Sequence, residues 1–313
     1  MARLLNLCAT AGLALPVGVG AQGPQAQIEL WRLSGRPPPT LEVDSETSAA
    51  ALPDLQRAET EDDAFGAQVI LKRQDTPKRF SMFVESSGSF TNNVALVHRD
   101  RQRDRFVVAS SGAAFTERFG YHLRFDANVR ASLYRYDKFR ELDFQSVDAS
   151  GGLTWSPPPL HGAEANLRYT FTDLTTAKSG DEFYKNHAVL LGLQKVVPFS
   201  RAHAAYFGAS AQWSWADPVA AQRDEYVVFA GYHLQAMRQL DADVLYRYGR
   251  YGYSAGTGRW DNNHTLSATL RYTPCEWAAL SLTSFIGFNR SNRREFDYAV
   301  WNGGLSLQLS VRF

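Results

Sequence analysis

The sequence predicts an all-β chain, an antiparallel transmembrane β-barrel of about twelve strands that follows an N-terminal periplasmic extension. Two observations predict this fold. Apolar and polar residues alternate from about residue 79 to the last residue, 313. After the first twenty residues no apolar run reaches the roughly eighteen that a membrane-spanning helix needs. Lys and Arg (33) nearly balance Asp and Glu (32). The chain therefore lacks the basic excess typical of proteins that bind nucleic acid.

The first residues have the order of a secretory leader. Arg3 supplies the positive region, residues 4–17 the apolar region, and Val19-Gly20-Ala21 the small residues of a cleavage site. Residues 1–21 are therefore expected to be a cleaved signal peptide, and Cys8 lies too early in them to mark a lipoprotein. Cys275 would then be the one remaining cysteine, which permits no intramolecular disulfide.

Residues 22–78 lack sustained periodicity and contain Pro37-Pro38-Pro39. We expect a periplasmic extension or a plug folded back on the barrel, partly disordered. Short apolar clusters at Ile28, Leu30 and Trp31 and at residues 69–71 indicate parts that could dock.

From residue 79 to 313 the period is two, the pattern of strands with two different faces. In the last strand five apolar residues alternate with polar ones: Leu305, Leu307, Leu309, Val311 and Phe313. A second clear alternation runs from Tyr121 to Leu133 and a third from Ala163 to Thr172. The predicted strands lie near 79–91, 104–117, 120–135, 143–156, 161–173, 184–197, 202–216, 224–237, 240–251, 261–273, 277–290 and 297–313. The second and sixth have small and apolar residues on both faces, which leaves a strand count of about ten to fourteen open.

The connections alternate between short turns, such as Arg238-Gln239, and more polar, mostly longer loops, such as residues 92–104. Outer-membrane barrels carry short periplasmic turns and longer external loops. An even strand count then predicts that both termini are periplasmic.

Aromatic residues near the strand ends predict two girdles at the membrane interfaces. The predicted girdle residues are Trp155, Phe171, Trp213, Trp215, Tyr246, Tyr248, Tyr272 and Trp301.

The tail resembles the C-terminal signal of Gram-negative outer-membrane β-barrel proteins, a porin-like class that ends in Phe or Trp with apolar residues at alternate positions before it. The resemblance implies a closed barrel from about residue 79 and a location in the bacterial outer membrane. It also implies that Leu307, Leu309, Val311 and Phe313 form an assembly signal for the barrel-assembly machinery.

Charged residues of the polar series are expected to face the lumen: Arg124, Asp126, Arg130, Asp148, Glu164, Arg168, Asp241, Asp243, Arg247 and Arg271. They could form a basic track for anionic solutes or cross-strand ion pairs that fill the interior. We favour the ion pairs because acids nearly match bases.

No motif predicts an enzyme, a cofactor or a metal site. The outer-membrane phospholipase, which is also a twelve-stranded barrel, needs an outward-facing His and Ser two apart, with an Asn beside them. The nearest residues are Asn263, His264 and Ser267, and His264 and Ser267 are three apart, which puts them on opposite faces of a strand. A hydrolytic pair of Asp261 and His264 has the same spacing, and an outer-membrane hydrolase is only a distant alternative.

The sequence thus favours a small porin-like channel for passive passage of hydrophilic solutes. The alternative is a non-conducting structural or assembly barrel whose N-terminal segment plugs the lumen or binds a periplasmic protein through residues 22–78. The other expected partners are outer-membrane lipid and lipopolysaccharide.

Overall fold

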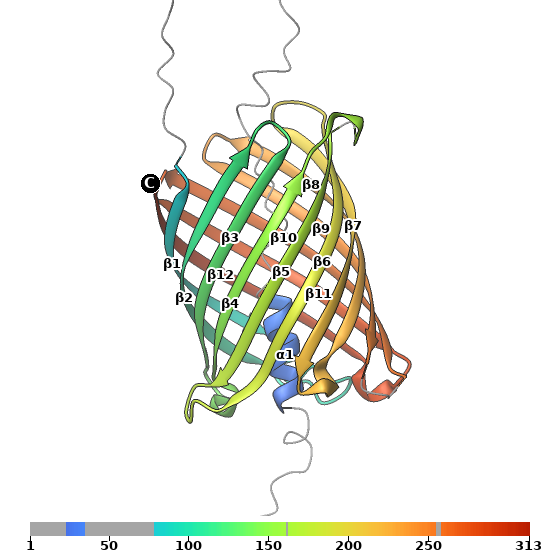
Figure 1. Cartoon of the computed structure of the whole chain (residues 1–313). Coiled ribbons are helices and arrows are strands. Elements are labelled where there is room, and N and C mark those ends of the chain that lie inside the picture. The colour runs from blue at the N-terminus through green and yellow to red at the C-terminus, as the bar shows by residue number, and fades with distance from the viewer. Residues whose placement is uncertain (1–22, 35–77, 161, 255–257) are drawn as a thin grey trace, which may run out of the picture.

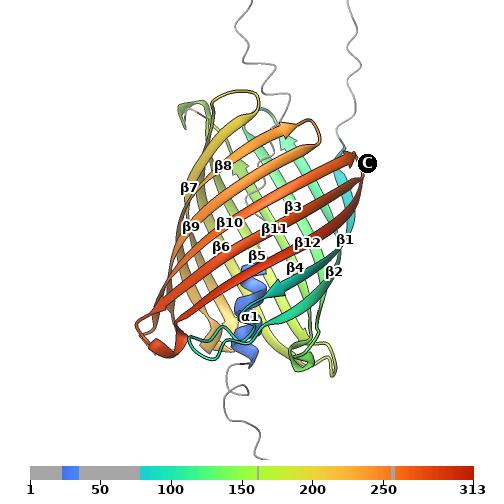
Figure 2. The same cartoon turned by 180° about the vertical axis from the view of Figure 1, so that it is seen from behind.

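The computed structural model describes residues 23–34, 78–160, 162–254 and 258–313. Twelve strands pair in chain order, each antiparallel to its neighbours, and β1 pairs with β12 to close the barrel (Figures 1 and 2). The strands are β1 (Phe80–Thr91), β2 (Asp104–Phe119), β3 (Leu123–Tyr136), β4 (Phe144–Trp155), β5 (Ala163–Thr176), β6 (Glu182–Pro198), β7 (His203–Asp217), β8 (Arg223–Met237), β9 (Leu240–Tyr253), β10 (Trp260–Cys275), β11 (Ala278–Ser291) and β12 (Tyr298–Arg312). No helix among the described residues is long and apolar enough to cross a membrane.

This topology confirms the predicted fold class and the strand count of twelve. The two least regular predicted strands both form, as β2 and β6. The predicted start of the third strand is wrong: Tyr121 was placed in this strand, but it lies fully exposed in a turn and β3 begins at Leu123. Gly120 has φ +68°, a left-handed conformation that suits glycine and reverses the chain before Tyr121 can pair.

The two ends of the barrel differ, and we name them by their connections. The turn mouth carries the start of β1, the end of β12 and the connections 120–122, 156–162, 199–202, 238–239 and 276–277. The loop mouth carries the connections 92–103, 137–143, 177–181, 218–222, 254–259 and 292–297. At the turn mouth, Phe80 and Phe313 join the first strand to the last through reciprocal backbone hydrogen bonds of 3.0 and 2.9 Å.

Helix α1 (Gly23–Ser34) lies inside the barrel at the loop mouth, although β1 begins at the turn mouth (Figures 1 and 2). Residues 23–34 belong to the segment for which the sequence left open a periplasmic extension or a plug folded back on the barrel. Strand parity fixes where β1 begins and β12 ends, and it places no constraint on a helix separated from β1 by more than forty residues. The remainder of the predicted extension and the predicted signal peptide lie outside the described residues.

Part of the lumen around α1 is apolar. Buried side chains from the helix, the strands and the loops form one cluster, called here the loop-mouth cluster: Ile28, Val94, Leu96, Phe106, Val108, Tyr134, Tyr136, Leu142, Phe144, Leu174, Tyr184, Ala216, Ala221, Tyr298 and Val300. Trp31 and Leu33 of α1 pack against it. The polar inner series that the sequence predicts is therefore interrupted at this mouth by apolar side chains, because part of the wall must match the apolar face of a helix.

Candidate functional site: the loop mouth and its helix

Two charged residues of α1, Glu29 and Arg32, attach the helix to the wall. They are three apart, so they share one helix face, and their side chains are joined by an Nη1–Oε1 distance of 2.7 Å. Glu29 accepts two hydrogen bonds from Arg223 Nη1, at 2.7 and 2.8 Å. Arg32 Nη2 donates to the Tyr184 hydroxyl and to the Ala221 carbonyl oxygen, each at 2.9 Å. Residues from the starts of β6 and β8 and from the loop before β8 therefore hold one helix.

Arg223 links Glu29 to a second carboxylate. Its Nε donates to Glu225 at 2.9 Å, its Nη1 donates to the Tyr253 hydroxyl at 3.0 Å, and its guanidinium lies 4.1 Å from the Tyr251 ring centroid. The side chains of Arg223 and Glu225 are only 3% and 2% exposed. A buried charge is stable only when paired and hydrogen-bonded, so removing one partner is costly, about 3–5 kcal/mol.

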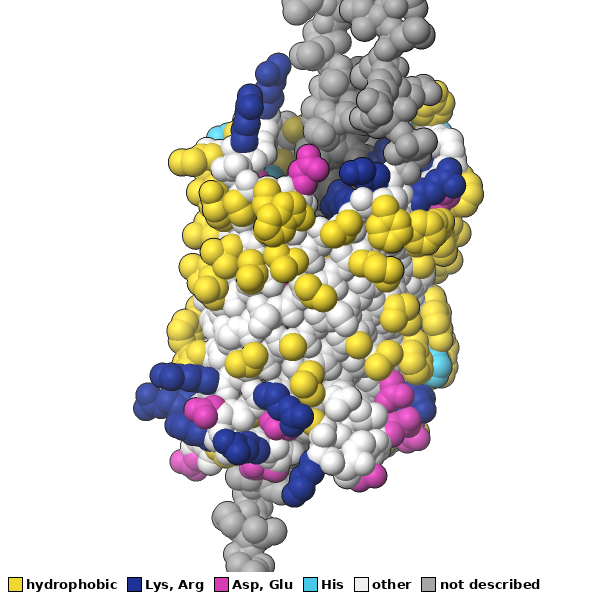
Figure 3. Space-filling view, turned by 90° about the vertical axis from the view of Figure 1, so that its left-hand side faces the viewer, with side chains coloured by type: hydrophobic (Ala, Val, Ile, Leu, Met, Phe, Trp, Pro, Cys, Tyr) yellow, Lys and Arg dark blue, Asp and Glu magenta, His cyan; other side chains and the backbone are white. Residues whose placement is uncertain are grey.

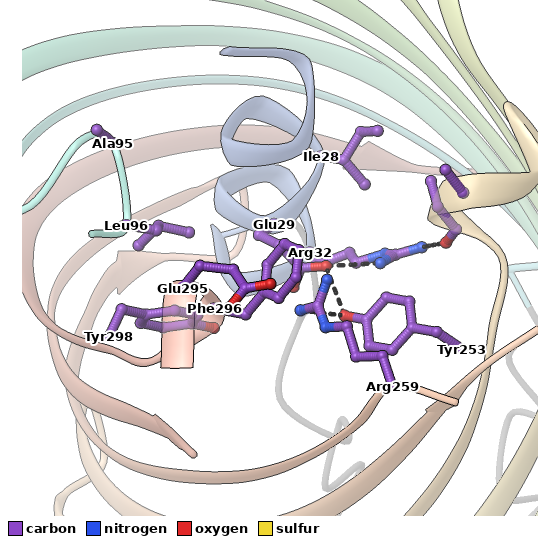
Figure 4. Close-up of a pocket in the computed structure, with 12 residues that line it drawn as sticks. Ile28, Glu29, Arg32, Ala95, Leu96, Tyr253, Arg259, Glu295, Phe296 and Tyr298 are labelled. Carbon is purple, nitrogen blue, oxygen red and sulfur yellow. Dashed lines mark hydrogen bonds and ion pairs between the residues drawn. The ribbon is translucent and has the colours of Figure 1, made fainter. Parts of the chain in front are cut away.

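Arg259 completes the site from the loop before β10. Its guanidinium lies between the rings of Tyr253 and Phe296, 3.9 and 3.5 Å from their centroids, and it donates to Asp261 through Nε at 3.0 Å. Figure 4 shows Tyr253, Arg259 and Phe296 beside Glu29 and Arg32 of the helix. They line a pocket of about 500 Å³, including its opening to solvent.

The charges around Glu29 control its ionisation. Burial alone raises the pKa of Glu29, but the positive charges of Arg223, Arg32 and Arg259 outweigh burial and lower the pKa from 4.5 to about 2. Glu29 is therefore ionised at neutral pH, and its negative charge stabilises the docked helix.

The predicted lumen residues lie on the inner face, and several form contacts across strands. Arg130 pairs with Glu85 at 2.7 Å, and Arg168 pairs with Asp126. Asp148 accepts hydrogen bonds from Ser146 and Thr172, and Glu164 from Ser156 and Gln194.

Nearer the turn mouth, Asp243 accepts a hydrogen bond from Tyr206 at 2.7 Å and lies 3.8 Å from His233, which lies 3.9 Å from Asp241. Arg271 lies opposite Asp241 in the register of β9 and β10, and Arg247 lies opposite Thr265. Arg124 lies opposite Thr154 on β4. The inner face here is a set of local polar contacts.

The predicted girdle residues lie on the outward series of their strands. Trp155 and Tyr272 are near the turn mouth, Tyr246 is near the middle of β9, and the others are nearer the loop mouth. Figure 3 shows apolar side chains in bands toward both ends of one face of the wall. The assembly-signal residues lie at the end of β12, where Leu309 and Val311 pair with β1.

His264 and Ser267 project to opposite sides of β10. The Tyr246 hydroxyl lies 2.8 Å from His264 Nδ1 on the outer face, whereas Ser267 donates to the Leu245 carbonyl oxygen. Among the described residues no three His, Cys, Asp or Glu side chains are grouped as metal ligands would be.

Comparison with solved structures gives the fold class. An outer-membrane channel from Pseudomonas putida F1 superimposes with a TM-score of 0.53 and 7% identity, covering 76% of this chain and 97% of that chain. The chain has the fold of outer-membrane β-barrels. This outer-membrane barrel also resembles the β domain of the Bordetella autotransporter BrkA, with a TM-score of 0.46, 8% identity and coverage of 74% and 100%. It further resembles a bacterial polysaccharide outer membrane secretin, with a TM-score of 0.44, 11% identity and coverage of 76% and 100%. No family model and no curated protein sequence matches the chain.

The sequence indicated docking through the apolar residues Ile28 and Trp31 of α1, but it did not identify Glu29 and Arg32, the charged residues that attach the helix. Glu29 and Arg32 three apart were an available signal, because with Ile28 and Trp31 they make a helix with one anchoring face. Arg223, Glu225 and Arg259 gave no such signal, since their partners are distant in the sequence.

Proposed function

We propose that this chain is a porin-like channel for small hydrophilic solutes that its own N-terminal helix closes at the loop mouth. The observation that carries the proposal is the docking of α1 within the lumen by the ion pair between Glu29 and the buried Arg223. The proposal gives the chain no catalytic role.

The two halves of the lumen support this reading. Toward the turn mouth the inner face is polar, as a path for hydrated solutes requires. At the loop mouth α1 lies in the interior and packs against the apolar cluster. The closure depends on charges as well as apolar contacts, and a few charge contacts provide a means of releasing the helix.

The substitution Glu29→Gln tests the closure. It leaves Arg223 and Arg32 facing a neutral group, which weakens docking by about 3–5 kcal/mol, or roughly 10²–10⁴-fold in the docking equilibrium. Single-channel recordings in planar bilayers should therefore show openings far more often in the variant than in the unmodified barrel.

Glu182→Gln is the matched control. Glu182 also pairs at the loop mouth, with Lys185, but both side chains are well exposed, at 41% and 37%, and such pairs contribute little. We expect its recordings to equal those of the unmodified barrel. Equal opening in both variants would contradict closure through Glu29.

Closure by α1 should also depend on pH. Because docking lowers the pKa of Glu29 from 4.5 to about 2, ionised Glu29 stabilises the docked state above pH 4.5, and this stabilisation, about 3 kcal/mol, is lost as pH falls toward 2. The groups that face Glu29 are Arg32, Arg223, Tyr253, Arg259 and Tyr298.

We expect little opening between pH 7 and pH 5. Below pH 4.5 the open fraction should rise by up to about tenfold per pH unit, because one proton is taken up on release. Single-channel recordings across this pH range measure the open fraction. The Glu29→Gln variant lacks the titrating group and should lose this slope; a slope unchanged in the variant would assign the acid response to another residue.

A further inference from the structure

The wall of the loop mouth binds the Glu29 carboxylate through groups that are held by the wall itself. Arg223 Nη1 donates to both oxygens of this carboxylate, at 2.7 and 2.8 Å, and the Tyr253 hydroxyl donates to Oε1 at 3.4 Å. Arg223 is oriented by contacts that do not involve α1, because its Nε donates to the buried Glu225 and its guanidinium lies over the Tyr251 ring. The wall therefore carries a carboxylate-binding group of its own.

A second part of the wall accepts hydrogen bonds from a cation. Arg32 Nη2 donates to the Tyr184 hydroxyl and to the Ala221 carbonyl oxygen, each at 2.9 Å. All three residues are more than nine-tenths buried. Arg32 Nη1 also lies 2.7 Å from Glu29 Oε1. A positive and a negative group thus lie side by side in this site, as the ammonium and the carboxylate do in a free amino acid.

The third part of the site is apolar. The Ile28 side chain is 2% exposed and belongs to the loop-mouth cluster together with Leu96 and Ala221, which come from two different loops. All three residues line the pocket drawn in Figure 4. The wall therefore removes an aliphatic side chain from water beside the two charge-binding groups, which favours binding.

The charge balance of the wall indicates which occupant fits this site. Among the described residues, the buried charges of the wall next to α1 belong to two pairs. Arg223 Nε donates to Glu225 at 2.9 Å. Arg259 Nε donates to Asp261 at 3.0 Å. The helix brings one acid and one base, which is again a neutral pair. An occupant with a net charge would leave one buried charge uncompensated, which is costly, whereas a zwitterion would not.

We propose that α1 occupies a binding site for a free, zwitterionic amino acid with an aliphatic side chain, which enters when the helix leaves. Its carboxylate binds Arg223, and its ammonium donates to the Tyr184 hydroxyl and the Ala221 carbonyl oxygen. Its side chain packs in the loop-mouth cluster. The helix and the amino acid exclude each other, so the amino acid favours the open state. This inference rests on the proposed function, because it requires that α1 can leave the site, and it gives that channel a ligand class.

Equilibrium dialysis of radiolabelled L-leucine against the folded full-length barrel in detergent tests the proposal. Glu29→Gln weakens the docking of α1, and the apparent affinity follows the fraction of barrels whose site is free of the helix, so leucine should bind about 10²-fold more tightly. The control Glu182→Gln should bind leucine as the unmodified barrel does. Leucine that bound beside the docked helix, with its ammonium on Glu29, would bind the variant more weakly. Unchanged or weaker binding to Glu29→Gln would therefore overturn the proposal.

Three analogues test the three parts of the site by competition with labelled leucine on the Glu29→Gln barrel. 4-Methylpentanoate lacks the ammonium, leucinamide lacks the carboxylate, and glycine lacks the aliphatic chain. Each should compete at least about tenfold less well than unlabelled leucine, because a hydrogen-bonded charge or a buried aliphatic chain contributes at least this factor to affinity. An analogue that competes as well as leucine would contradict the contact assigned to the group that it lacks.

The variant Arg223→Gln, Glu225→Gln tests the carboxylate contact from the side of the wall. It removes a neutral pair, so it keeps the charge balance, and it also releases α1 from Arg223. If Arg223 binds the ligand, this variant should bind leucine at least about tenfold less tightly than Glu29→Gln does. Equal binding by the two variants would contradict that contact. Heat-modifiable gel mobility verifies folding, and the analogues test the same contact on a barrel that keeps its wall intact.

The inference and the proposed function can fail separately, because dialysis measures binding without any current. A Glu29→Gln barrel that opens more often in recordings but binds leucine no more tightly would reject the amino-acid site and leave the closed channel in place. Tighter binding of leucine by a folded variant that never conducts would reject the channel and keep the site.

Discussion

A barrel lacking residues 22–34 is expected to conduct continuously, whereas the full chain stays closed most of the time. The deletion removes Ile28, Trp31 and both anchoring charges, and with them the occupant of the loop mouth. One buried ion pair favours docking of the helix by about 3 kcal/mol or more. The time-averaged conductance should therefore rise about 10²-fold when the helix is deleted.

A synthetic peptide of residues 22–34 provides the control for damage to the wall. Added to the deletion variant, it should restore closure, and the same peptide with Glu29→Gln should do so at much higher concentration. The folded state is verified by circular dichroism and heat-modifiable mobility. Full-length and deleted barrels that are folded and equally conducting would contradict closure by α1, and two folded barrels without any conductance would contradict the channel.

The second large effect is topological. A cysteine introduced by Gly23→Cys should be labelled by a membrane-impermeant maleimide added outside intact cells, while Cys275 should not react until the outer membrane is opened. Gly23 begins α1 at the loop mouth, whereas Cys275 ends β10 at the turn mouth. Barrels of this class place their short turns in the periplasm, so we expect the loop mouth to face outward.

Lys138→Cys serves as the reference for the loop mouth, since Lys138 is an exposed residue of the β3–β4 connection. Labelling at residue 138 but not at residue 23 would show that the start of α1 is shielded from the outside. Labelling of Cys275 alone would show that the barrel is inserted the other way round. Mass spectrometry of the labelled peptides distinguishes these results.

The fold could be predicted almost completely from the sequence. Alternation of period two is a local property, because lipid outside and polar groups inside demand opposite characters from adjacent residues. The strand limits differ from the predicted ones by three residues at most, as at Leu123 and Thr176, where turn geometry rather than alternation ends the pairing.

The docking of α1 in the lumen was only partly predictable. Ile28 and Trp31 indicated docking, but the partner of Glu29 is Arg223, 194 residues away. An ion pair over such a separation leaves no local periodicity.

The irregular alternation of β2 was an indirect sign that something apolar docks in the lumen. β2 has apolar residues on both faces because Val107 faces outward while Phe106 and Val108 face the cluster around α1. The alternation is broken in β2 because its inner side chains pack in the same cluster as α1. This reason can be seen only in the closed barrel.

The sequence by itself predicted an antiparallel barrel of about twelve strands and the two faces of its strands, because alternation depends on neighbours one or two residues apart. The tertiary structure alone decided that α1 lies in the lumen, at the mouth opposite the start of β1, and that Arg223 at the start of β8 meets Glu29. Both follow from closing the sheet, which brings together strand ends that no local pattern relates.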